Sequence, residues 1–134
     1  MAELNFTEKE LENRETMPWK DERCEAITGG ENKNRFLLYQ LKYSMMNADR
    51  IDIIVSFLME SGVRMLLKDL QRALERGTRI RILTGNYLGI TQPGALYLIK
   101  DALGDQIDLR FYKEKERSFH PKAYIFHKKG FGEI

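Results

Sequence analysis

The sequence of 134 residues predicts an α/β fold built on a mostly parallel sheet flanked by helices. Two observations carry this prediction. Segments with apolar residues at helical spacing alternate with short branched apolar runs, and glycines or prolines stand between them. Hydrophobic residues make up 43% of the chain and charged residues 31%, which suits one globular domain with a single core. The predicted order is α-β-α-β-α-β-β, with right-handed crossovers.

The first 33 residues are predicted to form an acidic arm outside the folded domain. Residues 1–31 carry nine acids and four bases, a net charge of −5, and Pro18 and Gly29-Gly30 interrupt them. One short helix is predicted from Thr7, because Thr7-Glu8-Lys9-Glu10 fits a capping box. The domain itself is predicted to span residues 34–134.

The domain begins with a predicted helix and a buried strand. Residues 34–47 have the apolar spacing of an amphipathic helix. The run Ile-Asp-Ile-Ile-Val-Ser-Phe at 51–57 is branched and mostly apolar, which is typical of a strand in a sheet covered on both faces.

Two further helix and strand pairs follow. A second helix is predicted after Ser61-Gly62 and ends at Gly77, a natural helix stop, and Arg-Ile-Arg-Ile-Leu at 79–83 is the next strand. A third helix begins at Thr91-Gln92-Pro93 and ends at Gly104.

The last two strands are predicted at residues 107–112 and around 122–126. A charged turn from Lys113 to Arg117 joins them. Because this turn is short, the two strands are predicted to pair as a hairpin.

His120 and Lys122 are the candidate catalytic residues. Side chains two apart on a strand share one face, so these two should lie together. An imidazole can act as a nucleophile or move a proton, and a lysine beside it offers positive charge to phosphate oxygens. Residues 110–129 carry seven bases and two acids, a net charge of +5, which attracts phosphate-bearing ligands. The pair therefore suits phosphoryl chemistry, in which charge on oxygen must be stabilised.

Four segments in order carry a resemblance to a known family. Phe-His-Pro-Lys-Ala-Tyr-Ile-Phe at 119–126 resembles the His-x-Lys strand of the phospholipase D superfamily. Residues 51–62, 79–85 and 87–91 resemble the preceding strands and turns of one branch. That branch is the phospholipase D-like domain at the N-terminus of bacterial DEAD/DEAH-type helicases and restriction-like proteins. The resemblance covers roughly residues 34–134.

The resemblance implies a nuclease-type phosphodiesterase that works through a phosphohistidine intermediate. His120 would be the nucleophile or the acid, and Lys122 would hold the phosphate. A second histidine, from a homodimer or from a second copy of the motif, would complete the site. The resemblance implies no metal and no cofactor for this domain. It implies DNA as partner, and a fused helicase domain that would bind ATP in the full-length protein.

The chain departs from the family pattern in three ways, one of which is that it has a single His-x-Lys motif where a complete site needs two. The superfamily often has an acid five positions after the lysine, where this chain has His127. We expect His127 to face away from His120 and to be structural or on the surface. The pattern also continues into a Gly-Ser-x-Asn-type segment, which would come after Ile134. The chain is therefore expected to be a fragment that lacks the closing part of its pocket, so that its activity in isolation is in doubt.

Further pocket candidates follow the predicted strands. Ligands bind outside the carboxyl ends of strands in open parallel sheets, where Ser56, Glu60 and Ser61 follow the first strand and Thr84 the second. Thr84 could donate a hydrogen bond to a phosphate, and Glu60 could hold His120 in one tautomer. Residues of ordinary turns would have the same positions.

The sequence also allows other functions. A non-catalytic module that binds nucleic acid or dimerises its host is the main alternative. An unrelated flavodoxin-like domain ranks last, because no glycine-rich phosphate loop of the usual spacing is present. No apolar run approaches the roughly 20 residues needed to cross a bilayer, and no stretch is typical of membrane-surface binding. The single cysteine, Cys24, cannot form an internal disulfide, which favours a cytoplasmic protein.

Overall fold

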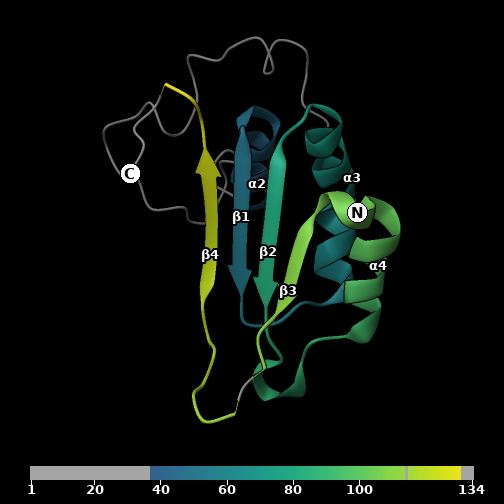
Figure 1. Cartoon of the computed structure of the whole chain (residues 1–134), viewed down its shortest axis with the longest axis vertical. Coiled ribbons are helices and arrows are strands. Elements are labelled where there is room, and N and C mark those ends of the chain that lie inside the picture. Colours follow the sequence, from purple (N-terminus) through teal and green to yellow (C-terminus); the bar gives the residue numbers. More distant parts are fainter. Residues whose placement is uncertain (1–36, 114, 131–134) are drawn as a thin grey trace, which may run out of the picture. The chain divides into compact units, whose positions relative to one another are not determined.

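The structure is a computed structural model that describes residues 37–113 and 115–130 (Figure 1). The predicted acidic arm, with its helix from Thr7, lies outside the described residues. The chain divides into two compact units, Met1–Ser44 and Met45–Ile134. Helix α2 spans Leu37–Asn47, which confirms the first predicted helix within the described residues. Tyr39 and Tyr43 stack one turn apart on it, with ring centroids separated by 6.3 Å.

The second unit has the predicted α/β architecture and element order. After α2 come β1 (Arg50–Val55), α3 (Glu60–Glu75), β2 (Arg79–Thr84), the 3-10 turn η4 (Tyr87–Gly89), α4 (Pro93–Leu103), the 3-10 turn η5 (Gly104–Gln106), β3 (Asp108–Phe111) and β4 (Lys122–His127). Pro93 opens α4, as predicted. Gly77 and Gly104 end α3 and α4 with positive φ angles of 86° and 61°, a conformation that favours glycine.

The sheet has the order β3-β2-β1-β4, in which β1, β2 and β3 are parallel and β4 is antiparallel to β1 (Figure 1). The predicted hairpin between the last two strands is therefore wrong. The chain leaves β3, crosses the carboxyl edge of the sheet and pairs with β1 instead. This pairing places Phe126 opposite Ile51 and Tyr124 opposite Ile53, so that apolar and aromatic side chains are cross-strand neighbours. The short strand β3 exposes three of its four residues and offers no comparable partners.

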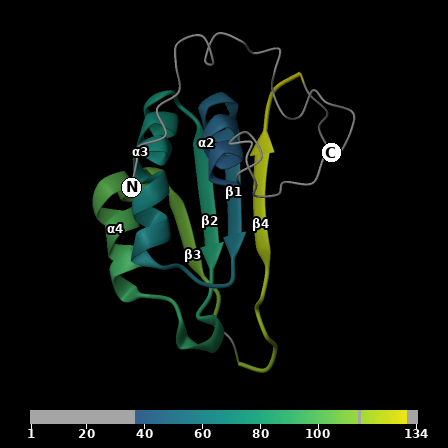
Figure 2. The ribbon, with the colours of Figure 1, turned by 180° about the vertical axis from the view of Figure 1, so that it is seen from behind.

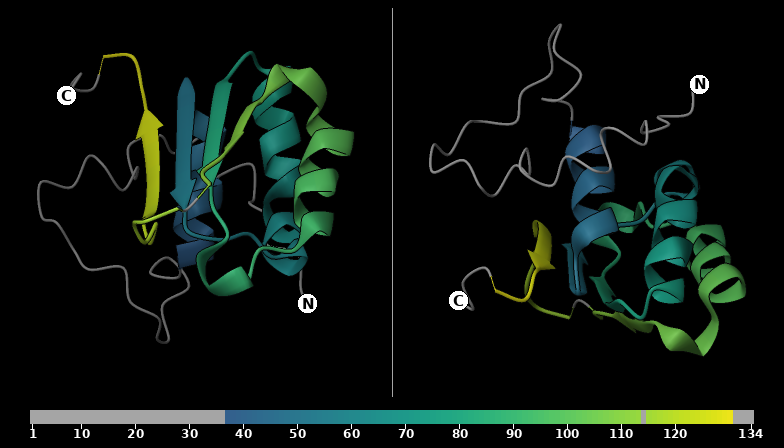
Figure 3. Two further views of the ribbon diagram at one scale, coloured as in Figure 1. Left: turned by 60° about the horizontal axis from the view of Figure 1, so that its bottom comes forward. Right: turned by 90° about the horizontal axis from the view of Figure 1, so that it is seen from above.

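One face of the sheet carries the core. Helices α3 and α4 lie on that face (Figures 2 and 3). The buried apolar side chains of the two central strands and the two helices are Ile51, Ile53, Val55, Ile80, Ile82, Val63, Leu70, Ala73, Ala95, Ile99 and Leu103. Burial of each large aliphatic side chain contributes about 1.5–3 kcal/mol.

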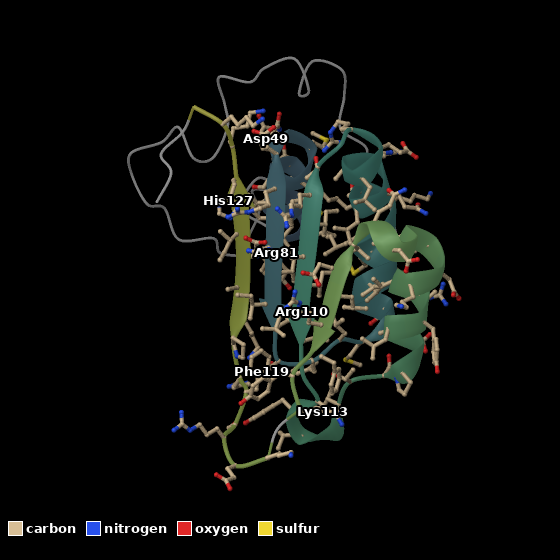
Figure 4. The ribbon with its side chains drawn as sticks, in the orientation of Figure 1. Asp49, Arg81, Arg110, Lys113, Phe119 and His127 are labelled. Carbon is tan, nitrogen blue, oxygen red and sulfur yellow. The ribbon has the colours of Figure 1, made fainter. Side chains whose placement is uncertain are left out.

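The opposite face is charged, so the prediction of a sheet covered on both faces is wrong. It exposes side chains of β2 and β3, namely Arg79, Arg81, Asp108 and Arg110. Arg81 and Arg110 are labelled on this face in Figure 4. The alternation Arg-Ile-Arg-Ile at 79–82 has the period of two that is typical of a strand with one buried and one solvent-exposed face. The apolar run at 51–55 concealed this, because its one acid, Asp52, is buried by ion pairing.

Candidate active site

Four chain segments meet at the carboxyl edge of the sheet. The parallel strands β1, β2 and β3 all end there, and the antiparallel β4 begins there (Figure 1). The segment before β4 is tied to the end of β1, because the Ser56 amide donates to the carbonyl of Pro121 at 2.9 Å. Topology alone therefore places His120 beside the loops that follow β1 and β2.

The structure brings the two predicted catalytic residues together. Lys122 Nζ lies 2.9 Å from His120 Nε2, and both side chains are exposed. An ammonium group can only donate, so Nε2 must accept and the ring proton belongs on Nδ1. In this tautomer the lone pair of Nε2 accepts the hydrogen bond from Lys122. The lone pair would become a nucleophile once the ammonium turned away, for example to the oxygens of a phosphate.

Tyr87 stacks on His120 and was missed in the sequence. Their ring centroids lie 4.2 Å apart, with an interplanar angle of 25°. Tyr87 belongs to η4, and its amide donates to the Ser56 carbonyl at 3.2 Å. This hydrogen bond holds the backbone that carries the ring. Stacking on a fixed ring restricts the imidazole plane, which is otherwise free to rotate on an exposed side chain. A tyrosine just after a strand that leads to the predicted site was the available signal.

A second stacked pair supports the segment that carries His120. Phe119 stacks on Tyr112 with centroids 4.7 Å apart and an angle of 21°. The Tyr112 amide donates to the Thr84 carbonyl at 2.7 Å, which continues the register of β3 on β2. Gly85 lies under Phe119, where an added Cβ would come within 2.9 Å of Phe119 Cδ1. Figure 4 shows Phe119 and Lys113 at this edge.

Thr91 joins the loops after β1 and β2. Its hydroxyl donates to the Gly85 carbonyl at 2.5 Å and accepts from the Leu58 amide at 3.2 Å. Its own amide donates to Asn86 Oδ1 at 3.1 Å. One side chain thus forms hydrogen bonds with backbone groups of two loops that are far apart in the sequence, and these bonds hold the loops after β1 and β2 together.

Ser56 and Thr84 lie at the predicted strand ends, but beneath the surface. Their residues are 1% and 0% exposed. Ser56 Oγ and Thr84 Oγ1 have no hydrogen-bond partner within the described part of the chain. Each hydroxyl can still donate and accept a hydrogen bond. A phosphate would contact them only if the loops above them moved.

Glu60 and Ser61 lie in the first turn of α3. The Glu60 carboxylate lies 3.8 Å from Arg64 and beside Gly94 of α4, and it makes no hydrogen bond to His120 in the region that the structure describes. The Glu60 amide donates to Gln92 Oε1 at 2.7 Å. Ser61 is exposed. Within the described residues, no hydrogen bond or ion pair joins any of the four additional candidates to His120 or Lys122.

His127 lies on the charged face of the sheet, with Asp52 as its partner. His127 Nε2 lies 3.0 Å from Asp52 Oδ2 and 2.9 Å from Arg50 Nη2, while Nδ1 lies 3.3 Å from the same Nη2. One tautomer satisfies both neighbours, with Nε2 donating to Asp52 and Nδ1 accepting from Arg50. The strand alternation places this group on the opposite face from Lys122, as expected for a structural histidine.

Asp52 is the centre of that network. Arg81 Nε donates to Asp52 Oδ1 at 2.6 Å, and Arg50 Nε lies 3.3 Å from Oδ2 without hydrogen-bond geometry. The hydrogen bond from Arg81 holds the pKa of Asp52 below its usual value, against the effect of burial, and His127 acts in the same direction. The charged form of Asp52 thus contributes to the stability of the sheet.

Asp52→Asn is expected to destabilise the fold by about 1–2 kcal/mol at neutral pH, since it removes the charge-assisted hydrogen bond from half-exposed Arg81 and the ion pair with half-exposed Arg50. Because the folded-state pKa is lowered, the difference from the unaltered protein should shrink as the pH falls below about 4. Urea unfolding at neutral pH and near pH 3.5 measures both effects. Asp108→Asn is the matched control: its exposed pair with Arg110 should matter little. An unchanged difference at low pH would contradict the prediction.

Comparison with known proteins adds no family. No protein family matches the chain, and no curated protein matches it. Among the described residues, no group of three or more His, Cys, Asp or Glu could hold a metal ion. Within the same residues, no helix is long and apolar enough to span a bilayer.

Proposed function

We propose that this chain is a phospholipase D-like phosphodiesterase domain that hydrolyses phosphodiesters of nucleic acid. The contact between His120 Nε2 and Lys122 Nζ supports this proposal most directly. It joins a potential nucleophile to a cation on an exposed edge. The resemblance of four segments to the superfamily supports it independently.

The proposed reaction has two steps. His120 Nε2 attacks phosphorus and forms a P–N bond, while the bond from phosphorus to the leaving oxygen breaks and an acid gives that oxygen a proton. Water then attacks phosphorus and gives a proton to the group that acted as the acid, the P–N bond breaks, and the phosphate monoester and free His120 are released. Lys122 turns from the ring nitrogen to the phosphate oxygens and stabilises their charge in both steps. Tyr87 keeps the ring plane fixed meanwhile.

The acid in the first step would be a second His120. A two-fold homodimer brings equivalent residues together at its interface, and His120 is exposed and so open to a partner. A second copy of the motif elsewhere in a longer chain would serve equally. In that longer protein we propose a fused helicase domain that binds ATP, with DNA as the shared substrate.

Hydrolysis of bis(p-nitrophenyl) phosphate in the presence of EDTA tests the proposal. We expect p-nitrophenolate release that the chelator does not reduce. Alkaline quenching followed by peptide mass spectrometry should find a p-nitrophenylphosphoryl group on His120, because phosphohistidine survives alkali. No turnover, turnover abolished by EDTA, or a label on another residue would reject the mechanism.

A non-catalytic nucleic-acid-binding or dimerisation module is the second candidate. The burial of Ser56 and Thr84 favours it, since their hydroxyls do not reach the exposed edge. Binding of an oligonucleotide that persists in His120→Ala and weakens steeply with salt, together with no turnover, would establish this candidate instead.

A further inference from the structure

A continuous series of side chains runs along the carboxyl edge with His120 in its middle. On one side, Phe119 is the chain neighbour of His120 and stacks on Tyr112. On the other side, His120 stacks on Tyr87, which is the chain neighbour of Leu88. The two ends of the series are open to solvent: Tyr112 is 38% exposed and Leu88 is 76% exposed. We call these five residues the aromatic series.

Neither packing nor backbone conformation explains why a leucine stands at position 88. Its φ and ψ angles are 51° and 22°, the left-handed region, where glycine or asparagine is far more comfortable than leucine. It also exposes more of its surface than any other large hydrophobic residue in the described part of the chain. Strain and exposure at one residue beside a candidate site point to contact with a ligand.

Positively charged side chains lie in one half of the series, in the turn between Tyr112 and Phe119. Lys113, Lys115 and Arg117 are exposed there, and with Glu114 and Glu116 the five residues of the turn carry a net charge of +1. Arg110 nearby is paired with Asp108 at 3.0 Å, so the turn supplies the less constrained charges. A chain of phosphates could follow this turn while its bases meet the rings.

We propose that the ligand of this edge is single-stranded nucleic acid, whose bases beside the reacting phosphate stack on Tyr112 and pack on Leu88. Stacking on aromatic side chains beside a positive groove is the general mode of single-strand binding. A duplex hides its base faces, and proteins read it with a helix or ribbon in a groove. This edge consists of loops with exposed rings. The inference rests on the function proposed above and names its substrate class.

Binding of labelled oligonucleotides tests the inference without requiring turnover. Fluorescence anisotropy would compare a 20-nucleotide oligo(dT) with a 20-base-pair duplex, in a His120→Asn background that cannot form the P–N bond. We expect binding of the single strand to be at least about tenfold tighter. Tyr112→Ala should weaken it at least about fivefold, since one base loses its ring, whereas Tyr112→Phe should keep it.

Two further variants separate ligand contact from folding. Leu88→Asn suits the left-handed backbone, so it should unfold no more easily than the unaltered protein while losing single-strand affinity. Tyr97→Ala is the matched control, because Tyr97 is an exposed aromatic residue on α4, 68% exposed and outside the aromatic series. The affinity of the Tyr97→Ala protein for the single strand should be unchanged.

The outcomes distinguish this inference from the proposed function. Equal binding of single strand and duplex, or full affinity in both Tyr112→Ala and Leu88→Asn, would overturn the inference even if diester hydrolysis is observed. Co-sedimentation with phosphatidylserine vesicles that Leu88→Asn abolishes, without strand selectivity, would also overturn it in favour of a lipid surface. Selective single-strand binding without any turnover would support the ligand class and reject the hydrolytic function.

Discussion

His120→Ala should lower turnover of bis(p-nitrophenyl) phosphate by about 10³-fold or more while leaving the free energy of unfolding nearly unchanged. Removal of a nucleophile removes the covalent route itself, and losses of this order or greater follow in enzymes with such a step. The fold should tolerate the change because His120 is exposed and precedes β4 rather than pairing within it. Initial rates at saturating substrate and urea unfolding give the two measurements.

The chain offers a matched control for this variant, since its only other histidine is His127. His127→Ala should keep turnover within about threefold of normal, because its partners Asp52 and Arg50 lie on the other face of the sheet. Chemical rescue gives a second control. In His120→Gly, added imidazole can stack on Tyr87 and should restore part of the turnover. Equal losses in the two histidine variants would refute the assignment of His120.

Lys122 should show a smaller, graded effect. Lys122→Ala should reduce turnover by about 10²-fold, as expected when one donor to the developing charge is removed. Lys122→Arg keeps the charge but not the compact ammonium, and an intermediate rate would indicate that charge is the main contribution.

The fold could be predicted from the sequence because its signals are local. Helical periodicity in residues 63–74, the stops at Gly77 and Gly104, and Pro93 at a helix start each depend on neighbours a few residues away. The place of β4 could not be predicted in this way. Whether a strand joins β3 or crosses to β1 depends on which partner buries more apolar surface, a long-range comparison that a short turn does not reveal.

The charged face was missed for a related reason. Asp52 stands alone as a charged residue in an apolar run, and its role is not visible in the sequence. In the structure it accepts a hydrogen bond from Arg81 on the neighbouring strand and forms an ion pair with Arg50 on its own strand. Conversely, the spacing of two residues correctly predicted that His120 and Lys122 lie together, although His120 precedes β4 and is not itself in the strand. The sequence offered Glu60 as a group that could hold His120 in one tautomer, and it gave no sign that Tyr87 stacks on the ring. Stacking across loops leaves no periodic trace in a sequence.

Gly85→Ala should damage both the fold and the site, and it is the sharpest test of how the edge is built. A Cβ there would lie 2.9 Å from Phe119 Cδ1, with the carbonyl oxygens of Ser56 and Tyr112 each at 3.5 Å. The ring cannot simply rotate away, because it is stacked on Tyr112. We expect a loss of about 1–3 kcal/mol in the free energy of unfolding, the usual cost of overpacking.

The displacement of Phe119 should also lower turnover, because Phe119 directly precedes His120 in the chain and would shift it. A shift of about 1 Å in a reacting group can cost about 10²-fold in rate, so Gly85→Ala should lose about that much turnover even at temperatures where it remains folded. Gly62→Ala is the matched control: its Cβ would meet nothing within 4 Å, and it lies in α3, where alanine should add about 0.5–1 kcal/mol of stability. Normal turnover in folded Gly85→Ala would mean that His120 is positioned by Tyr87 alone, and the stack of Phe119 on Tyr112 would then matter for binding rather than for catalysis.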